Sequence, residues 1–116
     1  MNWTPLIQEA QLQEIVRLSH QQPVVLFKHS TRCSISGTAL SRLERHWKDS
    51  EMADVKPYHL DLIAHRLISN RIAQVFGVEH QSPQLLLIRG GECVFNASHL
   101  DISYSDLKQR LAEVSK

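Results

Sequence analysis

The amino-acid sequence predicts an α/β fold in which a mixed sheet of four strands is flanked by helices on both faces. Short β-prone segments alternate along the chain with segments whose apolar residues recur at helical spacing, which is typical of a sheet covered on both sides. Two adjacent glycines mark a tight turn that makes the last two strands antiparallel. With 116 residues, 42% of them hydrophobic, the chain can build one core but not two. We therefore expect a single domain over residues 1–116.

The first half of the chain predicts two helices around one buried strand. Thr4 and Pro5 fit the start of a helix that runs to about Ser19, because proline is favoured at the first helical position. Residues 24–29 are rich in β-forming residues and are apolar at first, as in a strand buried on both faces. Apolar residues then recur at helical spacing over residues 35–47, which predicts the second helix.

The middle of the chain predicts a second strand and a third helix. Residues 56–62 alternate enough between apolar and polar side chains to form the strand. An apolar stripe over residues 64–76 then indicates a helix, which Asp61 can cap at its start and Gly77 can end.

The last third of the chain predicts a hairpin followed by a helix. Residues 84–88 form the third strand, the glycines at 90–91 form the turn, and residues 93–97 form the returning fourth strand. Residues 103–106 resemble a capping box for the final helix. The resulting order of elements is that of thioredoxin.

The composition excludes several classes of function. The formal net charge is +1, and lysines and arginines form no basic block, so we expect no nucleic-acid partner. The longest apolar runs, 24–27 and 85–88, are far too short to span a bilayer, so we expect no membrane association. The first residues lack the pattern of a signal peptide, which favours a cytoplasmic location. There Cys33 and Cys93 would stay reduced.

Cys33 is the residue most informative about function, because it lies at the expected junction between the first strand and the second helix. A cysteine there meets the positive end of a helix dipole and unpaired backbone N–H groups, which favour the reactive thiolate. Ser36 occupies the place where a dithiol redox motif carries its second cysteine. The pattern therefore indicates a one-thiol version of a thioredoxin-like active site.

Three segments together resemble the YtxJ-like monothiol bacilliredoxins, a thioredoxin-like family. Residues 28–36 resemble the family's active site, residues 82–84 its cis-proline loop, and residues 96–99 the turn after its last strand. The resemblance covers essentially the whole chain. One departure is Ser34, which stands where the family usually has proline.

The resemblance implies an enzyme that removes bacillithiol, a low-molecular-weight thiol, from protein cysteines. Its partners are then S-thiolated proteins and a small thiol, with bacillithiol as co-substrate and no permanently bound cofactor. Cys33 is the expected nucleophile, and an outside thiol must regenerate it. Cys93 should lie at the far end of the sheet, beyond disulfide reach, and is interpreted as a core residue. The Ser36 hydroxyl can either donate to the thiolate or merely bond the backbone, and both alternatives stay open.

The remaining candidate residues would bind substrate. Pro83 is expected to follow a cis peptide bond that faces the nucleophile in thioredoxin-like proteins. Lys28 or Arg32 could favour the thiolate or hold a carboxylate of the small thiol. His29 could pair with Cys33, but a structural role is favoured. The histidines show no spacing typical of a zinc site, and the oligomeric state stays open. The predicted substrate-binding residues are Arg32, Ser34, Ser82, Pro83, Asn96 and Ser98.

Two other functions remain as alternatives. A cysteine from each of two subunits, with two small thiols, could hold a [2Fe–2S] cluster, as in some monothiol glutaredoxins. The residues between Cys33 and Ser36 lack the Gly-Phe pair of those proteins, which argues against it. A non-catalytic thioredoxin-like adaptor is the third possibility, and a thiol that ionises like an ordinary cysteine would support it.

Overall fold

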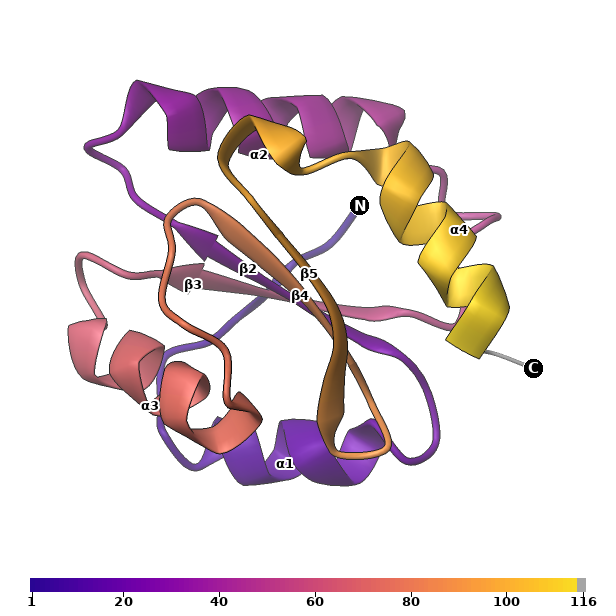
Figure 1. Ribbon diagram of the computed structural model, residues 1–116, viewed down its shortest axis with the longest axis horizontal. Coiled ribbons are helices and arrows are strands. Elements are labelled where there is room, and N and C mark those ends of the chain that lie inside the picture. The colour runs from indigo at the N-terminus through magenta and orange to yellow at the C-terminus, as the bar shows by residue number, and fades with distance from the viewer. Residues whose placement is uncertain (115–116) are drawn as a thin grey trace.

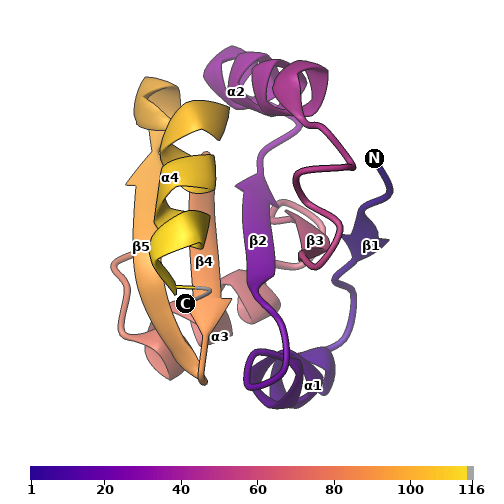
Figure 2. The ribbon, with the colours of Figure 1, turned by 90° about the vertical axis from the view of Figure 1, so that its right-hand side faces the viewer.

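The computed structural model describes residues 1–114 and is built on one sheet with the strand order β1-β3-β2-β4-β5. Figure 2 shows the five strands side by side, with β2 at the centre. Strands β1, β3 and β2 are parallel, whereas β4 runs antiparallel to both β2 and β5. The elements are β1 (Thr4–Pro5), α1 (Gln11–Leu18), β2 (Val24–His29), α2 (Ser34–His46), β3 (Lys56–Asp61), α3 (Arg66–Phe76), β4 (Gln84–Arg89), β5 (Glu92–Ser98), the 3₁₀ turn η1 (His99–Asp101) and α4 (Tyr104–Val114).

The predicted thioredoxin-like order is confirmed, but the prediction of four strands is wrong. Thr4 and Pro5 do not begin a helix; they form the short edge strand β1, which pairs with β3. Proline suits an edge position because it has no N–H to offer a further strand. The first helix instead begins at Gln11, whose side-chain oxygen accepts the N–H groups of Ile7 and Gln8 at 2.8 and 2.9 Å. The fifth strand is thus formed by residues assigned to the helix.

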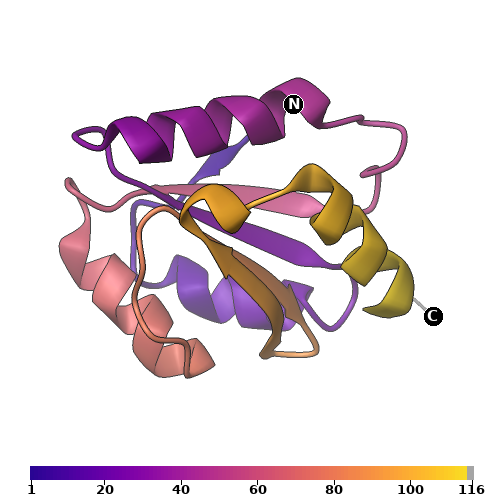
Figure 3. The ribbon, with the colours of Figure 1, turned by 45° about the horizontal axis from the view of Figure 1, so that its top comes forward.

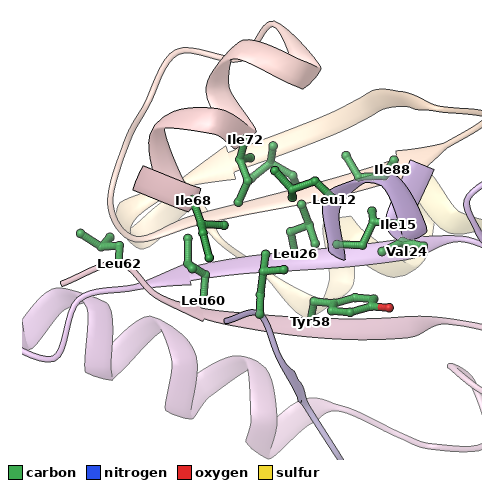
Figure 4. Packing of buried hydrophobic residues seen from close by; sticks show 12 residues of the cluster. Leu12, Ile15, Val24, Leu26, Tyr58, Leu60, Leu62, Ile68, Ile72 and Ile88 are labelled. Carbon is green, nitrogen blue, oxygen red and sulfur yellow. The ribbon is translucent and has the colours of Figure 1, made fainter. Parts of the chain in front are cut away.

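The helices cover both faces of the sheet in pairs. Helices α1 and α3 lie on one face, and α2 and α4 lie on the other (Figure 1 and Figure 3). On the first face, Ile15 and Ile72 are fully buried against Leu26 of the central strand, as Figure 4 shows. On the second face, Ala39 and Leu107 pack against the other side of the sheet. Consecutive residues of β2 point to opposite faces, so this strand is buried on both sides.

Both ends of α3 and the start of α4 show how local sequence sets the boundaries. Asp61 does not cap α3 directly: its carboxylate accepts the N–H groups of Ile63 and Ala64, and the helix begins only at Arg66. Gly77 ends α3 in the left-handed conformation, with φ 63°, as predicted. Ser103 accepts the N–H of Asp106 at 3.2 Å at the start of α4.

Within the part of the chain that the structure describes, no helix is long and apolar enough to cross a membrane.

Candidate functional site

Cys33 lies at the amino end of α2, in the loop that leaves the central strand β2. Its backbone is extended, and its carbonyl accepts the N–H of Gly37 at 3.2 Å to begin the helix. Its own N–H donates to the carbonyl of Ser30 at 3.2 Å, which closes the turn between strand and helix. The side chain is a partly buried free thiol. The first turn of α2 carries no acidic residue to oppose the positive end of the helix dipole, so the position suits a nucleophilic sulfur.

Ser36 is fully buried in the first turn of α2, and its hydroxyl has two hydrogen-bonding neighbours in the protein. Its oxygen accepts the backbone N–H of Ser30 at 3.0 Å and lies 2.7 Å from Nδ1 of His29. No hydrogen bond joins Ser36 to Cys33 among residues 1–114. Of the two expected arrangements the structure has the backbone-bonded one, with His29 as an additional partner.

His29 ends β2 and belongs to a pair of neighbouring imidazoles. Its ring centroid lies 5.4 Å from that of His59 on β3. The ring centroid of Trp3 in turn lies 6.0 Å from that of His59. Burial lowers the pKa of His29 below the usual value, and the nearby Asp61 and Glu44 carboxylates partly oppose this effect. Burial also lowers the pKa of His59, and repulsion from His29 lowers it further. Both effects of burial favour the neutral form of the rings.

Lys28 precedes His29 and points to the opposite face of the sheet, which α1 and α3 cover. It is fully buried; its amine donates to the carbonyl of Ser69 at 3.3 Å and lies 3.3 Å from Nδ1 of His80. Burial lowers the pKa of this amine to about 8. A buried amine that joins β2 to α3 is placed to support the fold and not to hold a carboxylate in solvent, so Arg32 is the better placed of the two predicted cations.

The Ser82–Pro83 peptide bond is cis, as expected. Pro83 directly precedes β4 at the edge where β2 ends, since Lys28 pairs with Gln84. The Pro83 carbonyl accepts the N–H of His99 at 3.0 Å, which ties the loop to the end of β5. The hydroxyl of Ser82 is buried and has no hydrogen-bond partner within residues 1–114. Buried polar groups are usually paired, so this unpaired hydroxyl is an exception that calls for an explanation.

The other predicted contacts lie at different distances from this edge of the sheet. Arg32 and Ser34 flank the cysteine and are both exposed. Ser98 ends β5 opposite Gln84 and is therefore level with the cis-proline loop. Asn96 is exposed two residues further back along β5. The loop after β2 and the loop after β3 lie at the same end of the molecule, on the left in Figure 1.

Cys93 lies at the opposite end of the sheet. It pairs with Ile88 on β4, which in turn pairs with Val24 at the start of β2. Lys28 lies four residues after Val24 along β2, which corresponds to roughly 13 Å. Cys33 lies beyond Lys28, past the end of the strand. A disulfide needs Cα atoms within about 7 Å of each other. Burial raises the pKa of the Cys93 thiol, which is the environment of an inert core cysteine.

Sequence reasoning missed the hydrogen bond between His29 and Ser36, and the burial of Lys28. A usable signal was present, because side chains alternate along a strand and must therefore send Lys28 and His29 to opposite faces. That Ser36 would turn toward the strand, and not toward the cysteine, depends on how the β2–α2 loop closes over Ser30.

The comparisons with known proteins assign the chain to the class of thioredoxin-fold redox proteins. A solved structure described as an oxidoreductase with a thioredoxin fold is 29% identical with a TM-score of 0.76, over 97% of this chain and 92% of that one. Thioredoxin of Malassezia sympodialis is 16% identical with a TM-score of 0.74, over 99% and 92%. Thioredoxin O2 of Arabidopsis thaliana is 20% identical with a TM-score of 0.71, over 98% and 95%. The last two support the fold alone.

The family follows from a more specific match. The model of the monothiol bacilliredoxin BrxC family matches residues 4–107, which include the cysteine, the cis-proline loop and β5. The chain belongs to this family, and its fold and family support a thiol oxidoreductase.

Proposed function

We propose that this protein removes bacillithiol, or a similar small thiol, from protein mixed disulfides through Cys33. The observation that supports the proposal is a single free thiol at the amino end of α2, in a chain of the monothiol bacilliredoxin family. The other cysteine is at the far end of the sheet, so the chemistry must proceed with one thiol.

The reaction takes place in two exchanges. The Cys33 thiolate attacks the small-thiol sulfur of the mixed disulfide; a new S–S bond forms, the old one breaks, and the protein thiolate leaves and takes up a proton. A second small-thiol molecule, as its thiolate, then attacks the adduct on Cys33. This step forms the disulfide of the small thiol and regenerates the Cys33 thiolate, so electrons and atoms balance.

The surrounding residues have distinct roles in this proposal. The backbone at Ser82 and Pro83 aligns the incoming disulfide, and the unpaired Ser82 hydroxyl bonds a polar group of the substrate. Arg32 and Ser98 bind the polar part of the small thiol from either side of the cysteine, where the arginine matches a carboxylate. Ser34 and the more distant Asn96 extend the same contact surface.

The cytosol is the proposed location, because two unpaired cysteines suit a reducing compartment.

The test is turnover of a test protein blocked with bacillithiol, comparing wild type with Cys33→Ala. Wild type should release the blocked thiol and carry a bacillithiol adduct on Cys33 by mass spectrometry, whereas the variant should release none. Cys93→Ser is the matched control and should release as much as wild type. Absence of release together with an unmodified Cys33 would refute the proposal, and a brown colour on anaerobic purification would favour a cluster protein instead.

A further inference from the structure

The Ser36 hydroxyl has one proton, and the structure restricts where that proton can go. A hydroxyl offers one donor and two acceptor lone pairs. The backbone N–H of Ser30 occupies one lone pair, at 3.0 Å, and Nδ1 of His29 is the second neighbour, at 2.7 Å. Because Ser36 is fully buried, water does not compete for the proton. The state of Nδ1 therefore decides whether Ser36 donates to His29 or has its proton free for another acceptor.

Cys33 is the candidate acceptor for a free Ser36 proton, because both residues lie at the amino end of α2. Cys33 precedes the first residue of α2 and Ser36 is the third residue of the helix, and side chains three positions apart are neighbours along a helix. The Cys33 side chain makes no capping hydrogen bond in the structure, so its sulfur need not give up such a bond to accept one from Ser36.

We infer that His29 is a positioning residue for the Cys33 thiolate and that it acts through the hydroxyl of Ser36. When Nδ1 carries no proton, Ser36 donates to His29 and the sulfur receives no hydrogen bond from it. When Nδ1 carries a proton, it donates to Ser36, and the hydroxyl proton turns to the Cys33 sulfur. The inference rests on the proposed role of Cys33 as the nucleophile and names the groups that would control its reactivity.

The charged groups around His29 are compatible with this coupling. From β3, His59 lies beside the ring and Asp61 follows; from α2, Glu44 faces it and Cys33 lies at the helix start. Burial lowers the pKa of His29, which favours the neutral ring. A thiolate on Cys33 adds a negative charge that favours a proton on Nδ1. By linkage, a proton on Nδ1 favours the thiolate to the same extent.

The decisive measurement is an NMR titration of His29 before and after Cys33 is blocked with iodoacetamide. A hydrogen bond to a charged group is strong enough to shift a coupled pKa by about one unit. We expect blocking to lower the pKa of His29 by about that amount in wild type, because the thiolate is lost. In Ser36→Ala the effect should fall by at least half, and Ser36→Thr, which keeps the hydroxyl, should restore it. An equal effect in Ser36→Ala, or none in wild type, would overturn the inference.

A second measurement separates the hydrogen bond from ring packing. In His29→Phe the Ser36 proton is free for the sulfur at every pH, so more thiolate is present at a pH where most of the thiol is protonated. Allowing for the lower nucleophilicity of a stabilised thiolate, alkylation should be about threefold faster there. His59→Phe changes the neighbouring ring, which makes no hydrogen bond to Ser36 within residues 1–114, and should stay within twofold of wild type. Equal changes in both variants would contradict the inference.

Neither measurement uses bacillithiol. A protein that shows the His29 coupling but releases no bacillithiol would therefore refute only the proposed function, and the reverse result would refute only the inference.

Discussion

Lys28 and His29 are adjacent in the sequence, yet they serve opposite faces of the sheet. His29 faces α2 and contacts Ser36 in the first turn of that helix, whereas Lys28 extends to α3 on the other face of the sheet. A lysine amine without solvent is destabilising unless it is neutral or hydrogen-bonded. Here Ser69 and His80 supply the two bonds, so the residue can persist, but its charge is not matched by an acidic side chain in a hydrogen bond or salt bridge within residues 1–114.

The buried Lys28 predicts a pH dependence of stability. Its pKa is lowered from 10.5 to about 8 by burial, so between these values the unfolded chain binds more protons than the folded protein. Stability contributed by this residue therefore rises with pH through that range. Relative to Lys28→Met, wild type should gain about 2 kcal/mol in free energy of unfolding between pH 7 and pH 9.5. Urea denaturation of both proteins at the two pH values measures the difference.

The comparison with Lys28→Met cancels the other titrating groups, which both proteins share. Lys48→Met is the matched control, because the Lys48 side chain is exposed. Its stability curve should stay parallel to that of wild type. If the Lys28→Met and wild-type values also changed in parallel with pH, the lysine would not titrate as its burial requires.

At the scale of single residues, the sequence was sufficient to predict a position where neighbouring residues in the chain determine it. Cys33 and its position before a helix could be predicted, because an apolar strand and a helical stripe flank it. The cis bond before Pro83 depended on the family resemblance as well. The partner of Ser36 could not be predicted, because it depends on the path of the four loop residues between the strand and the helix.

Among the secondary-structure elements, two glycines in helical contexts should respond to alanine with opposite signs. Gly37 lies inside α2 with no atom within 4 Å of an added Cβ, so alanine should stabilise the fold by about 0.5–1 kcal/mol through helix propensity. Gly77 ends α3 at φ 63°, where a side chain is strained, so alanine should cost about 1–2 kcal/mol. The urea midpoints of Gly37→Ala and Gly77→Ala measure both effects.

Each glycine variant is the control for the other, since the change in side chain is the same. A loss of stability in Gly37→Ala would mean that the space beside α2 is occupied in solution. Unchanged stability in Gly77→Ala would mean that α3 ends differently from the left-handed cap described here.

The elements that could be predicted were those with a long periodic pattern, and the missed one was short. Helices α2 and α3 carry apolar stripes over three turns, and β2 and β4 are apolar runs between turn signals. Strand β1 has two residues, too few for any period, and its Thr-Pro sequence also fits a helix start. Pairing with β3 and the burial of Leu6 decided the outcome, and both are tertiary effects.

At the scale of the whole molecule, the sheet keeps the two cysteines apart. Cys33 follows the end of β2, while Cys93 lies level with the start of that strand, so neither can reach the other without unfolding the hairpin. In the proposed reaction the protein therefore depends on an outside thiol. This dependence is a property of topology, since it follows from β4 and β5 running back to the far end of the sheet.

This dependence predicts that, without an outside thiol, the reaction stops after one turnover per protein molecule. Without free small thiol, wild type should release one blocked thiol per molecule and then retain the adduct on Cys33, and Cys93→Ser should behave identically. Ser36→Cys places a second thiol one helical turn away, so it should expel the small thiol and form a disulfide between positions 33 and 36. Mass spectrometry of the intact protein distinguishes the adduct from the disulfide. Loss of the adduct in wild type but not in Cys93→Ser would instead mean that the far cysteine resolves it, and that the sheet opens during the reaction.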